Sequence, residues 1–185
     1  MIKNTQVLHP WHGVETGENA PEFVNCIVEI PQGSRSKYEI DKASGLLKLD
    51  RVIYSSFHYP ANYGFIPQTY GDDKDPLDIL IISSMSIQPM CIVEAKVIGV
   101  MQMLDGGEGD DKIIGVAAND PAINYYENIE ELPKHFFSEL RHFFEQYKVL
   151  EKKSVKVEEF GNKQQALGII QKAMESYNNL FTEEK

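Results

Sequence analysis

The chain lacks long apolar runs. No stretch of its 185 residues approaches the roughly 18 apolar residues with which a helix crosses a bilayer. The opening segment Met1–Gln6 also lacks the apolar core of a secretory signal peptide. No internal repeat or low-complexity linker divides the sequence. These absences predict one cytoplasmic domain over residues 1–185, with no membrane partner and enough length to bury a core.

Cysteines and basic residues are sparse. Cys26 and Cys91 are the two cysteines and lie in separate apolar stretches, outside any C-x-x-C pair. We expect two buried free thiols, in keeping with a reducing compartment. The net charge is -10 and there is no Lys/Arg-rich run, which argues against a nucleic-acid partner. The acidic excess suits a protein that gathers cations, although solubility is an ordinary explanation.

The first three-quarters of the chain is typical of strands and turns. Apolar and β-branched runs recur, and the long one contains Gly99 as a candidate β-bulge. By contrast, the stretch from Tyr59 to Gly64 is rich in turn-forming residues. We expect strands over residues 24–30, 37–41, 46–49, 77–82, 92–103, 112–117 and 154–158.

The last quarter changes to helical spacing. Apolar residues from Glu131 to Tyr147 recur every three or four positions, with Pro133 near the first turn. A second helix is indicated from Leu167 to Phe181. We expect these aromatic side chains to pack in the core, with Tyr147 as the exception. Short strands followed by two helices predict an α+β, mainly β fold, a small closed or nearly closed barrel with helices outside.

Four aspartates fall within seven residues between Asp72 and Asp78. Extended backbone would put Asp73 and Asp75 on one face, and a turn at Pro76 would bring Asp78 to the same side. Two such charges about 5 Å apart repel by roughly 3 kcal/mol at an effective dielectric near 20. Binding a hard cation, Mg²⁺ or Mn²⁺, relieves that repulsion. A solvated acidic turn would have the same composition.

A second acidic segment runs from Asp105 to Lys112 and contains Asp110 and three glycines. It lacks the alternation and final glutamate of an EF-hand, so we reject that motif. Because it follows the long strand, we infer that it lies near the first acidic segment.

Candidate anion ligands come from other segments. Lys37, Glu39 and Asp41 share one face of an expected strand, while Tyr38 and Ile40 would pack inward. Arginine forks suit phosphate oxygens, and tyrosine hydroxyls donate to them. Each residue alone is also an ordinary surface or core residue. The further candidates are Arg51, Tyr59, Tyr63, Tyr147 and Lys148.

Taken together, these segments resemble the soluble family I inorganic pyrophosphatases, in the family's order and approximate spacing. The D-x-D-P-x-D element at residues 73–78 is the most specific piece, and residues 9–13 resemble the opening of the plant-type branch. Bacterial relatives share the remaining pattern. The other matching segments are residues 28–31, 37–41, 50–51, 59–64, 105–112 and 143–148.

The resemblance implies an OB-like five-stranded β-barrel with flanking C-terminal helices that hydrolyses pyrophosphate to two orthophosphates. It implies Mg²⁺ as cofactor, with Mn²⁺ as a substitute, and a homo-oligomer such as a hexamer. By position, the principal metal ligands are Asp73, Asp78 and Asp110, with Asp105 for additional metal. Asp75 accepts a proton from the attacking water. Glu29 and Glu39 support the carboxylates, and Tyr59 lines the cavity. The implied phosphate ligands are Lys37, Arg51, Tyr63, Lys112, Tyr147 and Lys148.

Two positions depart from the family pattern. Lys74 replaces a small or polar residue and would have to point away from bound metal. Gly106 stands where many bacterial members have a second acid. Two other functions remain open at this stage. One is a barrel module that binds single-stranded nucleic acid through Tyr59, Tyr63 and Phe65. The other is a metal-dependent phosphatase acting on nucleoside triphosphates.

Overall fold

The computed structural model describes residues 8–181. The opening residues Met1–Gln6, for which the sequence predicts no leader segment, lie outside this range. The strands are β1 (Phe23–Ile30), β2 (Ser36–Ile40), β3 (Leu47–Val52), β4 (Asn62–Phe65), β5 (Asp78–Ile82), β6 (Ile92–Asp105), β7 (Glu108–Gly109), β8 (Lys112–Ala117) and β9 (Val155–Asn162). The helices are α1 (Lys134–Gln146) and α2 (Lys163–Phe181), with short 3₁₀ turns η1 (Ile129–Glu131) and η2 (Val149–Glu151).

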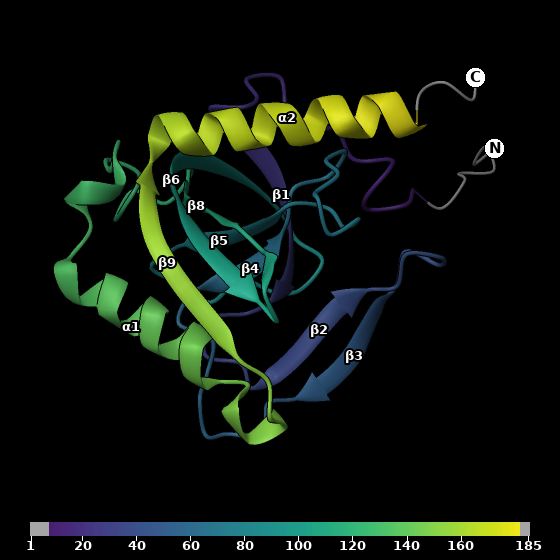
Figure 1. The fold of residues 1–185 in the computed structure, drawn as a ribbon. Helices are drawn as coiled ribbons and strands as arrows, with labels where there is room; N and C mark the ends of the chain where they lie inside the picture. The colour runs from purple at the N-terminus through teal and green to yellow at the C-terminus, as the bar shows by residue number, and fades with distance from the viewer. Residues whose placement is uncertain (1–7, 182–185) are drawn as a thin grey trace.

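Strands β1, β4, β5, β8 and β6 close into a barrel, because β6 pairs with both β8 and β1. The β5–β8 pair is parallel and the other pairs of the ring are antiparallel. Closure removes the free edges that an open sheet would expose. The mainly β, five-stranded barrel predicted from the sequence is therefore confirmed (Figure 1).

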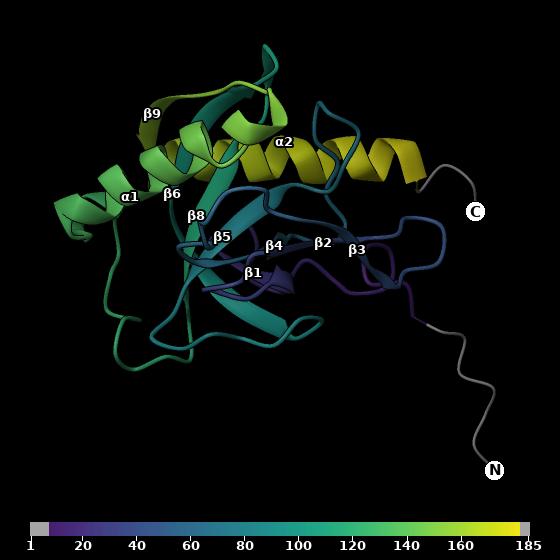
Figure 2. The same cartoon turned by 90° about the horizontal axis from the view of Figure 1, so that it is seen from below.

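The remaining elements surround this barrel. β9 extends the sheet along β6, α2 packs on β6, and α1 packs on β9. β2 and β3 form a separate antiparallel hairpin beside the barrel (Figure 1). Figures 1 and 2 both place the two ends of the described chain on the same side of the molecule.

Two glycines explain local departures of the backbone. At Gly64, an added Cβ would lie 1.9 Å from the Ile27 carbonyl oxygen, so only glycine lets β1 and β4 approach this closely. The composition of residues 59–64 predicts turns. In the structure, however, Asn62–Phe65 is strand β4. At Gly99 the β6–β8 register shifts, which confirms the predicted bulge.

The thiol prediction is half right. Cys26 on β1 is buried, and burial raises the pKa of its thiol well above the usual range. Cys91 is exposed, contrary to expectation. It follows a turn in which Met90 adopts a positive φ, and the first residues of β6 also lie at the surface. The apolar run that contains Cys91 is thus a barrel rim and not core.

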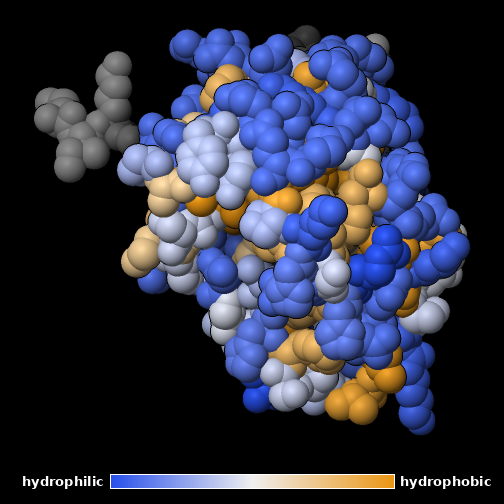
Figure 3. Space-filling view, turned by 90° about the vertical axis from the view of Figure 1, so that its left-hand side faces the viewer, coloured by the Kyte–Doolittle hydropathy of each residue, from blue (hydrophilic) through white to orange (hydrophobic). Residues whose placement is uncertain are grey.

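Within residues 8–181, no helix has the length and apolar character needed to cross a membrane. The face that carries α1 and β9 is mostly hydrophilic, with apolar side chains surfacing in small areas between polar ones (Figure 3).

Candidate active site

The first acidic segment is a tight turn and not the extended backbone that the sequence predicts. The Gly71 amide donates to the Asp75 carbonyl at 2.8 Å, and the Asp75 amide donates to the Asp73 carboxylate at 3.1 Å. Lys74 adopts φ 68°, a left-handed conformation that closes the turn. The three aspartates still lie together as predicted, because the turn brings Asp73, Asp75 and Asp78 to one cavity.

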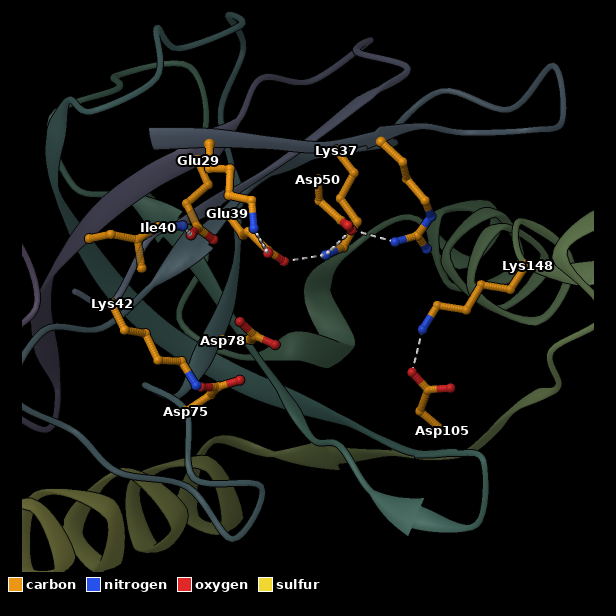
Figure 4. A network of polar contacts seen from close by, with 12 residues as sticks. Glu29, Lys37, Glu39, Ile40, Lys42, Asp50, Asp75, Asp78, Asp105 and Lys148 are labelled. Carbon is orange, nitrogen blue, oxygen red and sulfur yellow. Dashed lines mark hydrogen bonds and ion pairs between the residues drawn. The ribbon is translucent and has the colours of Figure 1, made fainter. Parts of the chain in front are cut away.

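That cavity measures about 490 Å³ and lies between the acidic turn, the barrel strands β1, β4 and β5, and the β2–β3 hairpin. Its polar lining comes from segments far apart in the sequence. In Figure 4 the carboxylates of Asp75, Asp78 and Asp105 face a common space, with Lys37 and Lys148 on other sides of it. The predicted site residues that line the cavity are Glu29, Lys37, Glu39, Tyr63, Asp73, Asp75 and Asp78.

Asp110 lies next to Asp78 and Asp73 in an adjoining cavity of about 120 Å³. Between Asp78 and Asp110 sits the ammonium of Lys112, which donates to both carboxylates from a side chain only 4% exposed. Burial alone would lower the pKa of Lys112, but the two carboxylates raise it. Burial, together with Asp78, raises the pKa of Asp73, and it also raises the pKa of Asp110. The carboxylates of this cluster therefore lie close enough to disfavour one another's charged form.

Glu29 links the barrel to the hairpin. It projects from β1, is 6% exposed, and accepts the Ile40 amide of β2 at 2.6 Å. Burial, followed by the nearby Asp78 charge, raises the pKa of Glu29 to about 8. The carboxyl is therefore largely protonated at neutral pH before any cation binds.

A group of cations faces the carboxylates from the hairpin and from the end of α1. Lys37 pairs with Glu39 at 3.3 Å and with Asp50 at 3.0 Å, which confirms the expected neighbours on β2. Lys148 contacts Asp105 at the end of β6, and its ammonium lies 5.3 Å from the Tyr147 ring centroid. These lysines bring positive charge to the side of the cavity opposite the acidic turn.

Arg51 is held on two sides. Its Nε donates to Glu151 at 2.9 Å and its Nη1 contacts Asp50. Its Nη2 is buried and has no hydrogen-bond partner among the described residues. A buried donor without a partner is costly, so this nitrogen is suited to an incoming acceptor such as a phosphate oxygen.

The tyrosines are buried. Tyr59, Tyr63 and Tyr147 are all less than a tenth exposed and belong to one core cluster. The expectation that Tyr147 is an exception to core packing is wrong, because Tyr147 belongs to this core cluster and stacks on Phe143 at 5.0 Å. Tyr59, Tyr63 and Phe65 are 2%, 9% and 1% exposed, so they present little ring surface on which bases could stack.

Sequence reasoning named no role for three residues of the site. Asp50 and Glu151 fix Arg51, and Lys42 contacts Asp75 from the hairpin turn. Asp50 could have been found from its place beside Arg51. Glu151 stands 100 positions from Arg51 and carries no motif, so no local signal identifies it.

The two departures from the family pattern have local explanations. Lys74 is exposed and is not among the residues lining the cavity, as the sequence required. Gly106 and Gly107 take φ 62° and 95° in the turn between β6 and β7, where side chains are disfavoured. The presence of glycine at position 106 is therefore explained by the backbone conformation of this turn and not by the number of metal ligands.

The donor chemistry of the cluster fits a hard divalent cation. The carboxylates supply oxygen ligands only, and burial with mutual repulsion raises the pKa of Asp73 and Asp110. Within residues 8–181 no three acidic, histidine or cysteine side chains enclose an ion-sized space as they stand. Lys112 instead fills the space between Asp78 and Asp110. The cluster thus already holds a positive charge, and a metal would share or displace that contact.

Comparison with known proteins identifies the family. A family model described as inorganic pyrophosphatase matches residues 26–178. A soluble inorganic pyrophosphatase of Oryza sativa is 49% identical over 175 residues, which cover 95% of this chain and 82% of that protein. Soluble inorganic pyrophosphatase 4 of Arabidopsis thaliana is 49% identical over 183 residues, covering 99% of this chain and 85% of the relative.

Solved structures give the same result. The inorganic pyrophosphatase of Thermus thermophilus superposes with a TM-score of 0.89 at 38% identity, covering 92% of this chain and 99% of that one. The enzyme of Helicobacter pylori gives 0.85 at 41% identity, with coverage of 89% and 98%.

The relatives named above are hydrolases that act on a phosphoanhydride, and those with solved structures share this OB-like barrel. Within that class, the chain belongs to the inorganic pyrophosphatase family.

Proposed function

We propose that this chain hydrolyses inorganic pyrophosphate to two orthophosphates with Mg²⁺, and that Mn²⁺ can substitute. The observation that carries the proposal is the separation of acidic and basic side chains around the cavity. Carboxylates of the acidic turn and β5 line one side of the cavity and Lys37 lines another, while Lys148 faces the same space in Figure 4. Arg51 pairs with Lys37 across the hairpin, and its buried Nη2 has no partner among the described residues. A small, highly charged anion accompanied by hard cations matches both sides.

The metal ligands in this proposal are Asp73, Asp78 and Asp110, with Asp105 serving metal that arrives with substrate. When bound, the cations supply positive charge that lowers the pKa of a water molecule. Asp75 takes the proton from that water, with Glu29 and Glu39 supporting the carboxylates. The protein forms no covalent bond in this scheme, so positioning and charge account for the rate.

The opposite side binds and neutralises the phosphate groups. Arginine's fork and the lysine ammoniums lie where charge develops on the leaving phosphate. Buried tyrosine hydroxyls donate to phosphoryl oxygens, since burial raises the pKa of each and keeps it protonated. The proposed set is Lys37, Arg51, Tyr63, Lys112, Tyr147 and Lys148, with Tyr59 lining the same space.

The test measures phosphate release from pyrophosphate at millimolar Mg²⁺, with a chelator control. Asp75→Asn should lower the rate by orders of magnitude. Asp72→Asn is the matched control, because Asp72 lies in the same turn but is 86% exposed and pairs with Lys172. Equal rates in the two variants would discard Asp75 as the base. No release with any divalent cation would discard the proposal.

The same assay with nucleoside triphosphates separates the remaining alternative. Preferential release of phosphate from a triphosphate would favour the phosphatase function over pyrophosphate hydrolysis. A cytoplasmic location and a homo-oligomer, with a hexamer as one candidate, belong to the proposal as well. Sedimentation at micromolar concentration tests the assembly.

A further inference from the structure

The segment His9–Gly13, here called the N-terminal arm, lies before the residues that the family model matches. It is nonetheless firmly docked. Trp11 is 4% exposed and packs among Tyr70, Tyr177 and Phe181. The arm thus spans from the C-terminal part of α2 to the segment that leads into the acidic turn.

One end of the arm fixes the approach to the acidic turn. The Trp11 indole donates to the Thr69 carbonyl at 2.9 Å, and the Gln68 amide donates to the Trp11 carbonyl at 2.9 Å. Thr69 is fully buried, and its hydroxyl accepts the Leu77 amide at 2.9 Å, next to Asp78. Trp11 is therefore tied to both ends of the loop that carries the aspartates.

The other end holds the opposite wall of the cavity. His9 Nε2 lies 3.0 Å from the Lys42 carbonyl oxygen, and His9 Nδ1 accepts the Trp11 amide at 3.2 Å. The tautomer that carries its proton on Nε2 satisfies both contacts. A Cβ added at Gly45 would lie 2.9 Å from Pro10, so the hairpin turn and the arm are in close contact.

Lys42 joins these contacts to the reacting groups. Its carbonyl is held by His9, while its ammonium contacts the Asp75 carboxylate (Figure 4). Lys42 and Asp75 both line the main cavity. The arm therefore reaches the acidic turn by two routes. One runs from His9 through Lys42 to Asp75, and the other runs from Trp11 through Thr69.

We propose that the N-terminal arm is a positioning clasp that fixes the β2–β3 turn against the acidic turn and so sets the width of the cavity for substrate. This inference rests on the proposed pyrophosphate hydrolysis. His9 and Trp11 touch neither substrate nor metal in this proposal. They act through Lys42 and Thr69.

The test uses His9→Ala, which removes the link to Lys42 and leaves the Trp11 contacts in place. We expect KM for pyrophosphate to rise about threefold to tenfold, with kcat within about twofold, as for the loss of one hydrogen bond. His9→Gln, whose amide nitrogen can donate to the same carbonyl, should restore KM. His135→Ala, at an exposed position on α1, is the control. An unchanged KM in His9→Ala, or a His9→Gln variant as impaired as His9→Ala, would overturn the clasp.

Hydrogen exchange tests the clasp without activity. The Gly45 amide donates to the Asp41 carbonyl at 2.8 Å within the hairpin turn. Its exchange should accelerate in His9→Ala and stay unchanged in His135→Ala, and equal exchange would contradict the proposal. Trp11 is the only tryptophan, so its emission checks that each variant is folded. If the wild type releases no phosphate, the proposed function fails and exchange alone decides the clasp.

Discussion

The charged residues of this site lie on two parts of the molecule, the barrel and the β2–β3 hairpin, whose side chains differ in solvent exposure. Lys112 on barrel strand β8 is 4% exposed and sits between two carboxylates. On the β2–β3 hairpin, the side chains of Lys37 and Glu39 are 21% and 43% exposed. Coulomb interactions are strong where water is excluded and weak where it is not. The barrel should therefore govern the energetics of the site, while the hairpin should adjust substrate binding.

The sharpest test of this contrast is Lys112→Met. It leaves Asp78 and Asp110 facing each other, so we expect a loss of about 3–5 kcal/mol in the free energy of unfolding of metal-free protein at neutral pH. Removing one charge that stabilises the transition state should lower kcat about 10²–10³-fold. Urea unfolding and phosphate release measure the two effects.

Lys96→Met is the matched control for Lys112. Lys96 is also a buried lysine, but it pairs with Glu127 and the Asn124 carbonyl, outside the cavity. We expect this variant to lose stability and keep kcat. A Lys112→Met enzyme as active as Lys96→Met would remove Lys112 from the phosphate-binding set.

The second prediction concerns Glu29, which links the barrel to the β2–β3 hairpin. Its folded pKa of about 8 lies above the ordinary 4.5, so between these values the folded chain binds more protons than the unfolded chain. Stability of the metal-free protein should therefore fall as pH rises through this window. Glu29→Gln should remove about 1–3 kcal/mol of that fall. Parallel pH slopes in urea unfolding of the two proteins would show that Glu29 ionises normally.

Arg51 offers an intermediate case, since it lies on the hairpin but is anchored to η2 by Glu151. Glu151→Gln keeps the size of the side chain and removes its charge, and we expect a loss of about 1–2 kcal/mol in the free energy of unfolding. KM should rise because the guanidinium is less firmly oriented. The exposed Glu139 on α1 is the control position, and Glu139→Gln should change neither quantity. Equal behaviour of the two variants would contradict the role of Glu151.

The sequence predicts more of the barrel than of the site. Nearly continuous apolar runs locate β1, β5, β6 and β8, because these strands bury residues on both faces. It misses β4, since Asn62 and Gly64 look like turn residues. Only the approach of Ile27, almost forty positions away, explains why glycine is needed there.

Within the site, the sequence shows which residue types are present but not which residues contact one another. The acidic turn is visible as a cluster of aspartates, yet its left-handed Lys74 is not. The placement of Lys112 beside Asp78 follows from the parallel pairing of β5 and β8, which local patterns do not encode. The assigned roles of these residues in catalysis stay predictions until the variants are measured.

The smallest expected effect is at Lys48 on β3, an exposed residue of the cavity lining. Its ammonium lies 4.0 Å from Glu39 and its side chain is 62% exposed, so solvent screens the pair. Lys48→Met should change the free energy of unfolding by less than about 0.5 kcal/mol and kcat/KM by less than about twofold. Lys37→Met on the same hairpin should raise KM several-fold, because Lys37 is more buried and pairs with two carboxylates. If Lys48→Met proved as damaging as Lys37→Met, exposure would not decide which charges matter, and the contrast between barrel and hairpin would fail.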